Sequence, residues 1–160
     1  MPIRRGLAIA TLTVMLSASV AAAQLPNAPP ARLATAASLT CRFSVMATGT
    51  WKDGTAESSV KPARLSVAYR SVNIDEGTAE SVGAAGNSHI TVRLSGNYLH
   101  FMQMEPYGAL YVTTVFATAA PTGALLAVHT RHEFTPVSLP GLTSRPELYV
   151  GECDVSPARR

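Results

Sequence analysis

The segment Leu39–Val45, which reads LTCRFSV, contains the pattern that decides the fold of this 160-residue chain. Apolar side chains occupy every second position of this segment, and polar or charged side chains occupy the positions between them. A period of two places the apolar residues on one face of a β-strand, whereas a helix requires a period near 3.6. The same alternation recurs over residues 65–70 and 90–95. Each of these segments therefore predicts a strand with one buried and one solvated face.

Further strands and short turns follow along the rest of the chain. Residues 97–104, 110–116 and 124–134 are rich in β-branched and aromatic side chains, as strands tend to be. Turn residues separate the predicted strands at Asp53-Gly54, 83–87, 95–97, 105–108 and 121–123. Connections this short join antiparallel neighbours, because parallel neighbours need a crossover of a dozen residues. One helical turn is expected only at 146–150, since proline suits the first position of a helix.

The sequence therefore predicts an all-β fold, a single antiparallel meander of seven or eight strands. We expect this meander to form a small closed or nearly closed barrel, because closure removes exposed sheet edges. A two-sheet sandwich is the alternative, since it produces the same alternation.

The first 23 residues have the features of a cleaved secretory signal peptide. Arg4 and Arg5 form a basic start, an apolar run covers 6–20, and three alanines at 21–23 provide a cleavage site. The apolar run is shorter than the roughly 20 residues that span a membrane, so no stable membrane anchor is expected after cleavage. We expect a mature chain that begins at Gln24 and is periplasmic or secreted. Residues 24–38, which contain three prolines, are predicted to be a flexible leader, 39–155 one β domain and 156–160 a tail.

Cys41 and Cys153 are the two cysteines of the chain, and they lie near the start and the end of the patterned region. Cysteines present in even number in an exported chain usually pair, so we predict a Cys41–Cys153 disulfide. The bridge requires Cα atoms within roughly 7 Å. It would close a loop of about 113 residues and contribute up to ~4.8 kcal/mol to stability. Such a bridge suits a closed meander, whose first and last strands are neighbours. A reactive thiol pair is the alternative, but the C-x-x-C spacing typical of that chemistry is missing.

The charge distribution disfavours nucleic acid as a partner. The chain has 13 Lys and Arg residues against 10 Asp and Glu residues, and loss of Arg4 and Arg5 with the signal leaves a net charge of +1. The remaining cations are scattered singly, without the basic run or basic-aromatic stripe that binds nucleic acid.

Catalytic and cofactor-binding motifs are missing from the sequence. It has no G-x-S-x-G, P-loop, dinucleotide fingerprint or H-E-x-x-H motif, and its acidic residues are scattered. We therefore predict no catalytic residues, no cofactor and no metal site.

The segment His129-Thr130-Arg131-His132-Glu133 is the most suggestive stretch for a binding site. On a helix, His129 and His132 would share a face and could chelate a metal, but on a strand they point to opposite faces. The surrounding pattern favours a strand that buries the even-numbered positions 126–134. We interpret His132 as a hydrogen-bonded core histidine, and Arg131 and Glu133 as a solvated, charge-paired face. His129, Arg131 and His132 remain candidate binding residues.

Two aromatic residues in or beside turns are further candidate binding residues. Trp51 precedes the Asp53-Gly54 turn, and Tyr107 lies within the 105–108 turn. Exposed aromatic side chains can anchor a partner. Capping one end of a barrel is the alternative role for both.

Short strings across the chain resemble a group of small exported bacterial proteins of uncharacterised function. These strings are TTVF at 113–116, AVHTRH at 127–132 and YVGEC at 149–153, together with Leu39-Thr40-Cys41. The resemblance implies an exported, disulfide-closed β domain and implies no activity. Ser95-Gly96-Asn97-Tyr98 is similar to the Ser-Gly-containing loop of periplasmic inhibitors of c-type lysozyme, which are small β-barrels with a cysteine bridge.

These observations predict a non-catalytic binding or structural module of the bacterial cell envelope. Its expected partner is an envelope protein or a small apolar ligand. An interior pocket would favour the ligand, and a filled core would favour protein contacts. The alternatives are an inhibitor of an envelope-directed enzyme such as lysozyme, and an unrecognised enzyme. An enzyme would require His, acidic or Arg side chains that converge in one cleft.

Overall fold

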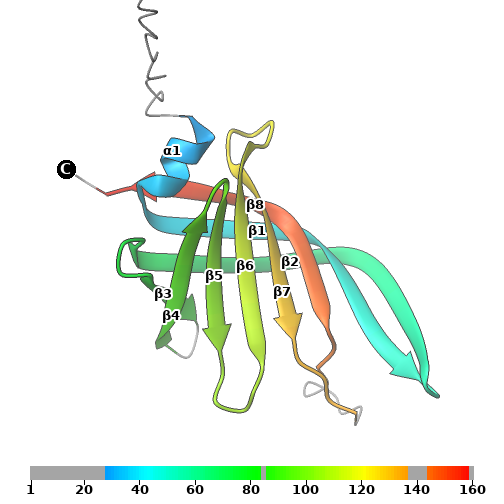
Figure 1. Ribbon diagram of the computed structural model, residues 1–160. Coiled ribbons are helices and arrows are strands. Elements are labelled where there is room, and N and C mark those ends of the chain that lie inside the picture. The colour runs from blue at the N-terminus through cyan, green and yellow to red at the C-terminus, as the bar shows by residue number, and fades with distance from the viewer. Residues whose placement is uncertain (1–27, 84–85, 137–143, 159–160) are drawn as a thin grey trace, which may run out of the picture.

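Eight strands in one closed sheet make up the protein (Figure 1). The computed structural model describes residues 28–83, 86–136 and 144–158. A short helix comes first in these residues, and the strands follow it in chain order: α1 (Pro29–Ala34), β1 (Ala36–Lys52), β2 (Thr55–Asn73), β3 (Thr78–Gly83), β4 (Gly86–Ser95), β5 (Tyr98–Met104), β6 (Leu110–Ala119), β7 (Leu125–His132) and β8 (Glu147–Pro157). Within the described ranges, no helix is long and apolar enough to cross a membrane.

The strands form an antiparallel meander that closes on itself. Each strand pairs with the next one along the chain, and β8 pairs antiparallel with β1 over Ala36–Thr48. The all-β prediction is therefore confirmed, and the single closed sheet excludes the two-sheet sandwich. Figure 1 shows β1, β2 and β8 crossing behind β3–β7, with the tip of the β1–β2 hairpin projecting beyond the other strands.

Predicted turns join the strands at 53–54, 95–97, 105–108 and 121–123, and residues 84–85 of the predicted 83–87 turn lie outside the described residues. At Asp53 and Gly54 the φ angles are 50° and 79°, as a two-residue type I′ hairpin requires. In the β5–β6 connection, the Gly108 N–H donates to the Glu105 carbonyl at 2.9 Å. These short connections keep successive strands adjacent, and adjacency is what builds the meander.

The N-terminal boundary of the fold differs from the prediction. Residues 29–34 form α1 and β1 begins at Ala36, so the predicted flexible leader is wrong over this part, while 24–27 and the predicted signal lie outside the described residues. Leu33 of α1 is fully buried in the core, and α1 covers one end of the sheet (Figure 1). A six-residue helix is held by such burial rather than by its own propensity, so it has no periodic signature. The helical turn expected at 146–150 is also wrong, because β8 occupies this segment from Glu147.

The predicted disulfide is present. Cys41 and Cys153 are directly opposite each other in the β1–β8 register, and their Cα atoms are 3.9 Å apart. Both side chains are fully buried inside the sheet. The covalent link therefore joins the first and last strands at the pairing that closes the ring.

A bulge in β1 reverses the alternation that predicted the fold. The register of β1 with both neighbours shifts between Phe43 and Val45. Phe43 is 2% exposed, whereas Val45 is 41% exposed on the outer surface. The prediction that these two residues share the buried face is therefore wrong, because the extra residue at a bulge changes which face the following side chains occupy.

Gly151 makes this bulge possible. It lies opposite Phe43, and a Cβ atom at this position would stand 2.6 Å from the Phe43 Cα and still closer to the Arg42 carbonyl oxygen. Both obstructing groups are backbone, which cannot rotate away as a side chain can. The close approach of β8 to β1 therefore requires glycine here.

We expect Gly151→Ala to lower the free energy of unfolding by about 2–4 kcal/mol, because the added methyl group forces two paired backbones apart. Gly49→Ala is the matched control in β1, since a Cβ there would meet nothing within 4 Å. The control should change the free energy of unfolding by less than about 0.5 kcal/mol. Urea unfolding of both variants measures the difference, and equal midpoints would contradict the role given to Gly151.

Candidate functional site

Polar side chains gather inside the sheet at the end opposite α1, which we call the mouth. Residues directly paired across strands share a face, so the registers define rows of side chains across the interior. One row runs Gln103–Tyr111–Arg131–Glu147 from β5 to β8. The row beneath it runs Phe101–Thr113–His129–Tyr149. The mouth is therefore built on four consecutive strands, which hold its side chains rigidly.

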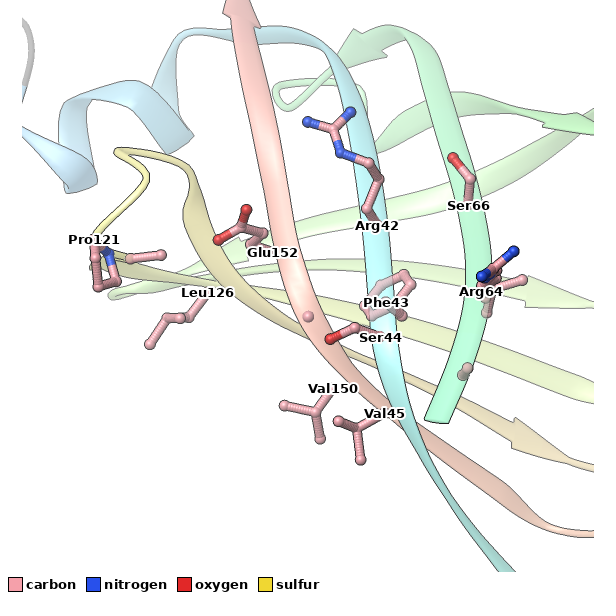
Figure 2. A pocket seen from close by; sticks show the side chains of 14 residues that line it. Arg42, Phe43, Ser44, Val45, Arg64, Ser66, Pro121, Leu126, Val150 and Glu152 are labelled. Atoms are coloured by element: carbon pink, nitrogen blue, oxygen red, sulfur yellow. The ribbon is translucent and has the colours of Figure 1, made fainter. Parts of the chain in front are cut away.

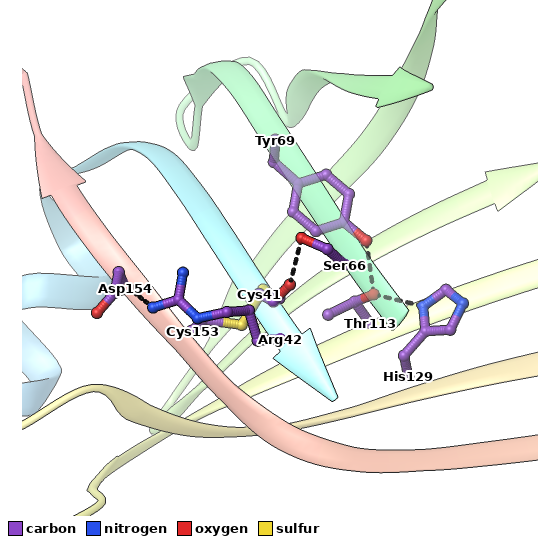
Figure 3. Close-up of a disulfide and its surroundings, with 8 residues drawn as sticks. All are labelled: Cys41, Arg42, Ser66, Tyr69, Thr113, His129, Cys153 and Asp154. Carbon is purple, nitrogen blue, oxygen red and sulfur yellow. Dashed lines mark hydrogen bonds and ion pairs between the residues drawn. A yellow bond between two sulfur atoms is a disulfide. The ribbon is translucent and has the colours of Figure 1, made fainter. Parts of the chain in front are cut away.

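A chain of three polar side chains crosses the interior beneath the mouth (Figure 3). The Tyr69 hydroxyl lies 2.5 Å from Thr113 Oγ1, which lies 2.8 Å from His129 Nδ1. All three side chains are buried, with Thr113 only 1% exposed. Burial raises the pKa of Tyr69 to about 12, although the hydrogen bond with Thr113 opposes this shift. Tyr69 therefore stays protonated at neutral pH, and the three side chains form a neutral hydrogen-bonded network.

His129 is a neutral histidine at physiological pH. Burial lowers its pKa to about 4, and the nearby positive charge of Arg131 acts in the same direction. Its ring lies among those of Phe43, Tyr149 and Tyr111, at centroid distances of 5.7, 5.9 and 6.4 Å. A neutral imidazole with Nδ1 engaged by Thr113 leaves Nε2 for one further hydrogen bond.

Arg131 lies between two tyrosine rings at the rim of the mouth. Its Cζ atom is 5.8 Å from the centre of the Tyr111 ring and 5.6 Å from that of Tyr149, within the range of cation–π attraction. Its Nη1 atom is 3.5 Å from Glu147 Oε2, and the Tyr149 hydroxyl donates to the same oxygen at 2.6 Å. The guanidinium is thus placed by aromatic faces and a carboxylate together.

Burial and neighbouring carboxylates both raise the pKa values of the rim tyrosines. The Tyr111 hydroxyl donates to Glu133 Oε2 at 3.1 Å. Burial and then its hydrogen bonds raise the pKa of Tyr111. Burial and the bond to Glu147 raise the pKa of Tyr149 to about 12. These phenols therefore serve as hydrogen-bond donors rather than as bases.

A cavity of about 290 Å³ opens at the mouth. Strands β2 to β7 contribute its walls, which combine aromatic rings with polar groups. The lining residues are Leu65, Ser66, Val67, Tyr69, Ser81, Val82, Gly83, Ile90, Phe101, Gln103, Tyr111, His129 and Arg131. The Tyr69 and Phe101 rings stack on each other with centroids 4.0 Å apart and close the inner end of the cavity. The cavity therefore combines an aromatic lining with hydrogen-bonding groups.

A larger, shallow groove of about 710 Å³ lies over β1, β2, β7 and β8 (Figure 2). Its most exposed apolar side chains are Val45, Leu126 and Val150. Arg42, at its margin, forms an ion pair with Asp154. This groove shares Leu65 and Ser66 with the cavity of the mouth, but Tyr69, Tyr111, His129 and Arg131 line only the cavity, so we assign the candidate site to the smaller cavity.

The structure reverses the predicted faces of β7. Leu125, Ala127 and His129 are buried, whereas Leu126 is exposed. The interpretation of His132 as a core histidine is therefore wrong: His132 is exposed, and its Nε2 lies 3.0 Å from Thr130 Oγ1. Arg131 lies on the same inward side as His129, at the rim, where its side chain is 35% exposed and paired with Glu147. The expectation that His129 and His132 point to opposite faces is confirmed, so they cannot bind one ion together.

The two aromatic candidates occupy different places. The Tyr107 hydroxyl lies 3.1 Å from that of Tyr111, so Tyr107 extends the polar network of the mouth. Trp51 lies near the tip of the β1–β2 hairpin, and its exposed ring contacts that of Phe134 edge-on at 5.2 Å. The structure thus brings Tyr107, His129 and Arg131 together and leaves Trp51 and His132 outside this group.

Sequence reasoning missed Tyr69, Tyr111 and Tyr149, although a signal for Tyr149 was present. Cys153 must face inward to form the disulfide, and positions 149, 151 and 153 share a face of a regular strand. This parity places Tyr149 inside. No comparable marker identifies the inward face of β6, so Tyr111 could be recognised only from the folded chain.

Neither a metal cluster nor a known relative assigns a function to the mouth. In the described part of the chain, no three His, Cys, Asp or Glu side chains are grouped so as to hold a metal ion. No protein-family model, curated protein or solved structure matches the chain. The interpretation therefore depends on the geometry of the mouth.

The lowered pKa of His129 predicts that acid destabilises the fold. The unfolded chain binds a proton at His129 near pH 6.5, whereas the folded chain binds it only near pH 4. The free energy of unfolding should therefore keep the whole contribution of His129 above pH 6.5 and should fall by about 3 kcal/mol as the pH drops toward 4. Urea unfolding across this range measures the loss.

His129→Gln should remove this part of the pH dependence of the free energy of unfolding, whatever the substitution does to that free energy at pH 7. His132→Gln, which changes an exposed histidine, is the control and should retain the wild-type slope. If the free energy of unfolding of His129→Gln fell with pH as steeply as that of the wild type, His129 would be protonated normally in the folded state.

Proposed function

We propose that the protein is an exported, non-catalytic binding module of the bacterial cell envelope, and that its mouth binds a small aromatic molecule with a polar edge. The observation that carries this proposal is the 290 Å³ cavity lined by tyrosine and phenylalanine rings, His129 and Arg131. Ligand sites are typically concave, largely aromatic or apolar, and equipped with a few polar groups that orient the ligand. The mouth has all three properties.

The size and lining of the cavity narrow the class of ligand. Its volume lies at the lower end of the roughly 300–1,000 Å³ range of ligand pockets, so the ligand is small. The half-buried Tyr111 ring in the cavity wall favours a planar ring. Ser81, Gln103 and Arg131 supply polar groups for the ligand's edge. A wholly apolar ligand, expected from the sequence, fits less well because it would leave these polar groups unpaired.

The protonation states of the mouth favour binding over catalysis. A general base works best with a pKa near the operating pH, whereas His129 has a pKa of about 4. Thr113, the hydroxyl next to His129, is almost completely buried and out of reach of a substrate. Arg131 and His129 do converge in one cavity, as the enzyme alternative requires, but they lack an accessible nucleophile beside them among the described residues.

Two features support export. The Cys41–Cys153 bond requires an oxidising compartment, such as the periplasm or the medium. The N-terminal 23 residues carry the signal-like pattern described above. Placement in the cell envelope follows from these features and from the resemblance to small exported bacterial proteins.

Binding can be tested with three matched probes that share one ring and differ in charge: benzoate, benzamide and benzylamine. We expect at least one to bind with a dissociation constant in the range of about 1–10 mM, which is typical for so small a ligand. In ¹H–¹⁵N correlation spectra, the shifted backbone amides should lie around the mouth, such as those of Gln103, Tyr111 and Arg131.

Ser81→Phe, which fills the cavity from β3, should abolish these shifts. Ser95→Phe is the control, because Ser95 lies at the exposed end of β4 beside the β4–β5 turn. Shifts that persist in Ser81→Phe, or that cluster on the outer groove, would contradict the mouth as the site.

A second candidate function is inhibition of c-type lysozyme. Ser95-Gly96-Asn97-Tyr98 forms the β4–β5 turn, and all four residues are exposed, as insertion into an enzyme cleft requires. A molar excess of the purified protein should then slow cell-wall lysis by c-type lysozyme, and Tyr98→Ala should weaken this effect. An unchanged rate of lysis at high excess would eliminate this candidate.

A further inference from the structure

One edge of the sheet is open where β2 extends past its neighbour. β2 pairs with β1 from Thr55 onward, but β3 pairs with β2 only from Ala68 to Asn73. Among the described residues, no strand pairs with the other edge of β2 between Thr55 and Val67. Figure 1 shows this part of the hairpin projecting beyond the ring. A long edge of this kind presents unpaired N–H and C=O groups to another strand.

The hairpin turn decides which backbone groups are free. Lys52 and Thr55 are the first pair next to the two-residue Asp53-Gly54 turn. In a hairpin with such a turn this first pair is hydrogen-bonded, and hydrogen-bonded pairs then alternate with non-hydrogen-bonded pairs along the strands. Thr55, Glu57 and Ser59 therefore direct their backbone groups toward β1. Ala56, Ser58 and Val60 direct theirs outward, away from β1.

We propose that this edge pairs antiparallel with the same edge of a second copy of the chain, about a two-fold axis through Ser59. In this register Glu57 lies directly opposite Lys61 of the second copy, and the symmetry forms the same pair a second time. Glu57 and Lys61 are both exposed to solvent in the single chain. Opposite charges directly across two strands stabilise their pairing, and a self-complementary patch is what a two-fold interface requires.

The backbone groups fit the same register. An axis through Ser59 places Ser58 opposite Val60 of the second copy, so the outward groups of both residues meet. Both members of this pair belong to the outward set, and all four of their N–H and C=O groups find partners. An axis midway between two residues would instead set outward groups against inward ones.

Other registers that satisfy the backbone lose the charge pairs. Moving the axis to Ser58 places Glu57 opposite Ser59, and moving it to Val60 places Glu57 opposite Ala63. The axis through Ser59 is therefore the arrangement in which hydrogen bonding and charge agree. A strand register that is specified by both hydrogen bonding and charge is less prone to slippage than a register specified by only one of them.

Pro62 and Lys61 restrict the edge to this partner. Pro62 has no N–H group, so it ends the ladder opposite Ala56 of the second copy. Lys61 disfavours pairing with strands that lack an acidic residue at the matching position. The proposed interface thus runs from Ala56 to Pro62 and avoids open-ended association, because a two-fold contact closes after two copies.

Charge-swapped variants test the proposal by sedimentation equilibrium. The purified, oxidised protein should show a reversible monomer–dimer equilibrium. Glu57→Lys and Lys61→Glu should each raise the dimer dissociation constant at least about tenfold, since both symmetric pairs become like-charged. The double variant, which exchanges the two charges, should restore the wild-type constant. Glu76→Lys changes an exposed turn residue by the same charge and should have no effect.

Cross-linking supplies a second, independent readout. Ser59→Cys places two thiols on the axis and should yield a disulfide-linked dimer on mild oxidation, with Cys41–Cys153 intact. Thr55→Cys is the control, because its copies would lie about 27 Å apart, far beyond the reach of a disulfide. A far-UV circular dichroism spectrum and a melting temperature equal to those of the wild type verify that each variant is folded.

Three outcomes would overturn the proposal. The first is a protein that stays monomeric up to about 1 mM, which would leave the edge to solvent or to a different partner. The second is a dimer that is insensitive to both charge reversals or not rescued by the swap. The third is a cross-link in Thr55→Cys instead of Ser59→Cys, which would place the axis elsewhere.

Discussion

The pairing of β1 with β8 is the contact on which the rest of the structure depends. It joins strands whose cysteines are 112 residues apart in sequence, and it converts an open meander into a ring. Until this contact forms, both strands are sheet edges, and the chain must lose loop-closure entropy to bring them together. The Cys41–Cys153 bond lies within this pairing and limits the freedom of the unfolded chain. Gly151 permits the close approach of the two backbones two residues away from the bridge.

Closure gives the interior two ends of different chemistry. Near α1 the space is filled by Leu33 and other apolar side chains, which form one continuous core. At the mouth, two tyrosine faces and Glu147 surround the Arg131 guanidinium and replace part of the water it loses. His129, which has no such partner, instead has a lowered pKa and stays neutral. A ligand site and a filled core can therefore share one small ring, because the polar groups are confined to two adjacent rows of side chains.

The difference in length between β2 and β3 links the mouth to the free edge. β3 ends at Gly83, and its last residue paired with the longer β2 is Val82, opposite Ala68. Where β3 stops, the wall of the ring is incomplete, and the cavity is lined by Leu65 and Ser66 on one side and Val82 and Gly83 on the other. The part of β2 beyond this point carries the open backbone edge. One short strand thus creates both a recess for a small molecule and a surface for a second strand.

Local patterns in the sequence determined the secondary structure and the topology. A period of two, turn residues at short intervals and one cysteine near each end were sufficient to predict an antiparallel meander closed by a disulfide. Each of these signals concerns neighbours in sequence or a covalent pairing with a single possible partner. The mouth was only partly predictable: His129, Arg131 and Tyr107 were identified by residue type, but their association was not.

Tertiary structure decided which side of each strand faces inward. A period of two divides a strand into two faces without saying which is buried, and in β7 both sets begin with leucine, so Leu125 and Leu126 were indistinguishable. Their assignment depends on the position of β7 between β6 and β8 in the closed ring. The bulge after Phe43 and the burial of Leu33 likewise depend on contacts with segments far away in the sequence. These features arise because side chains from the whole chain fill the space inside a closed sheet. A local sequence pattern therefore cannot predict which side chains occupy it.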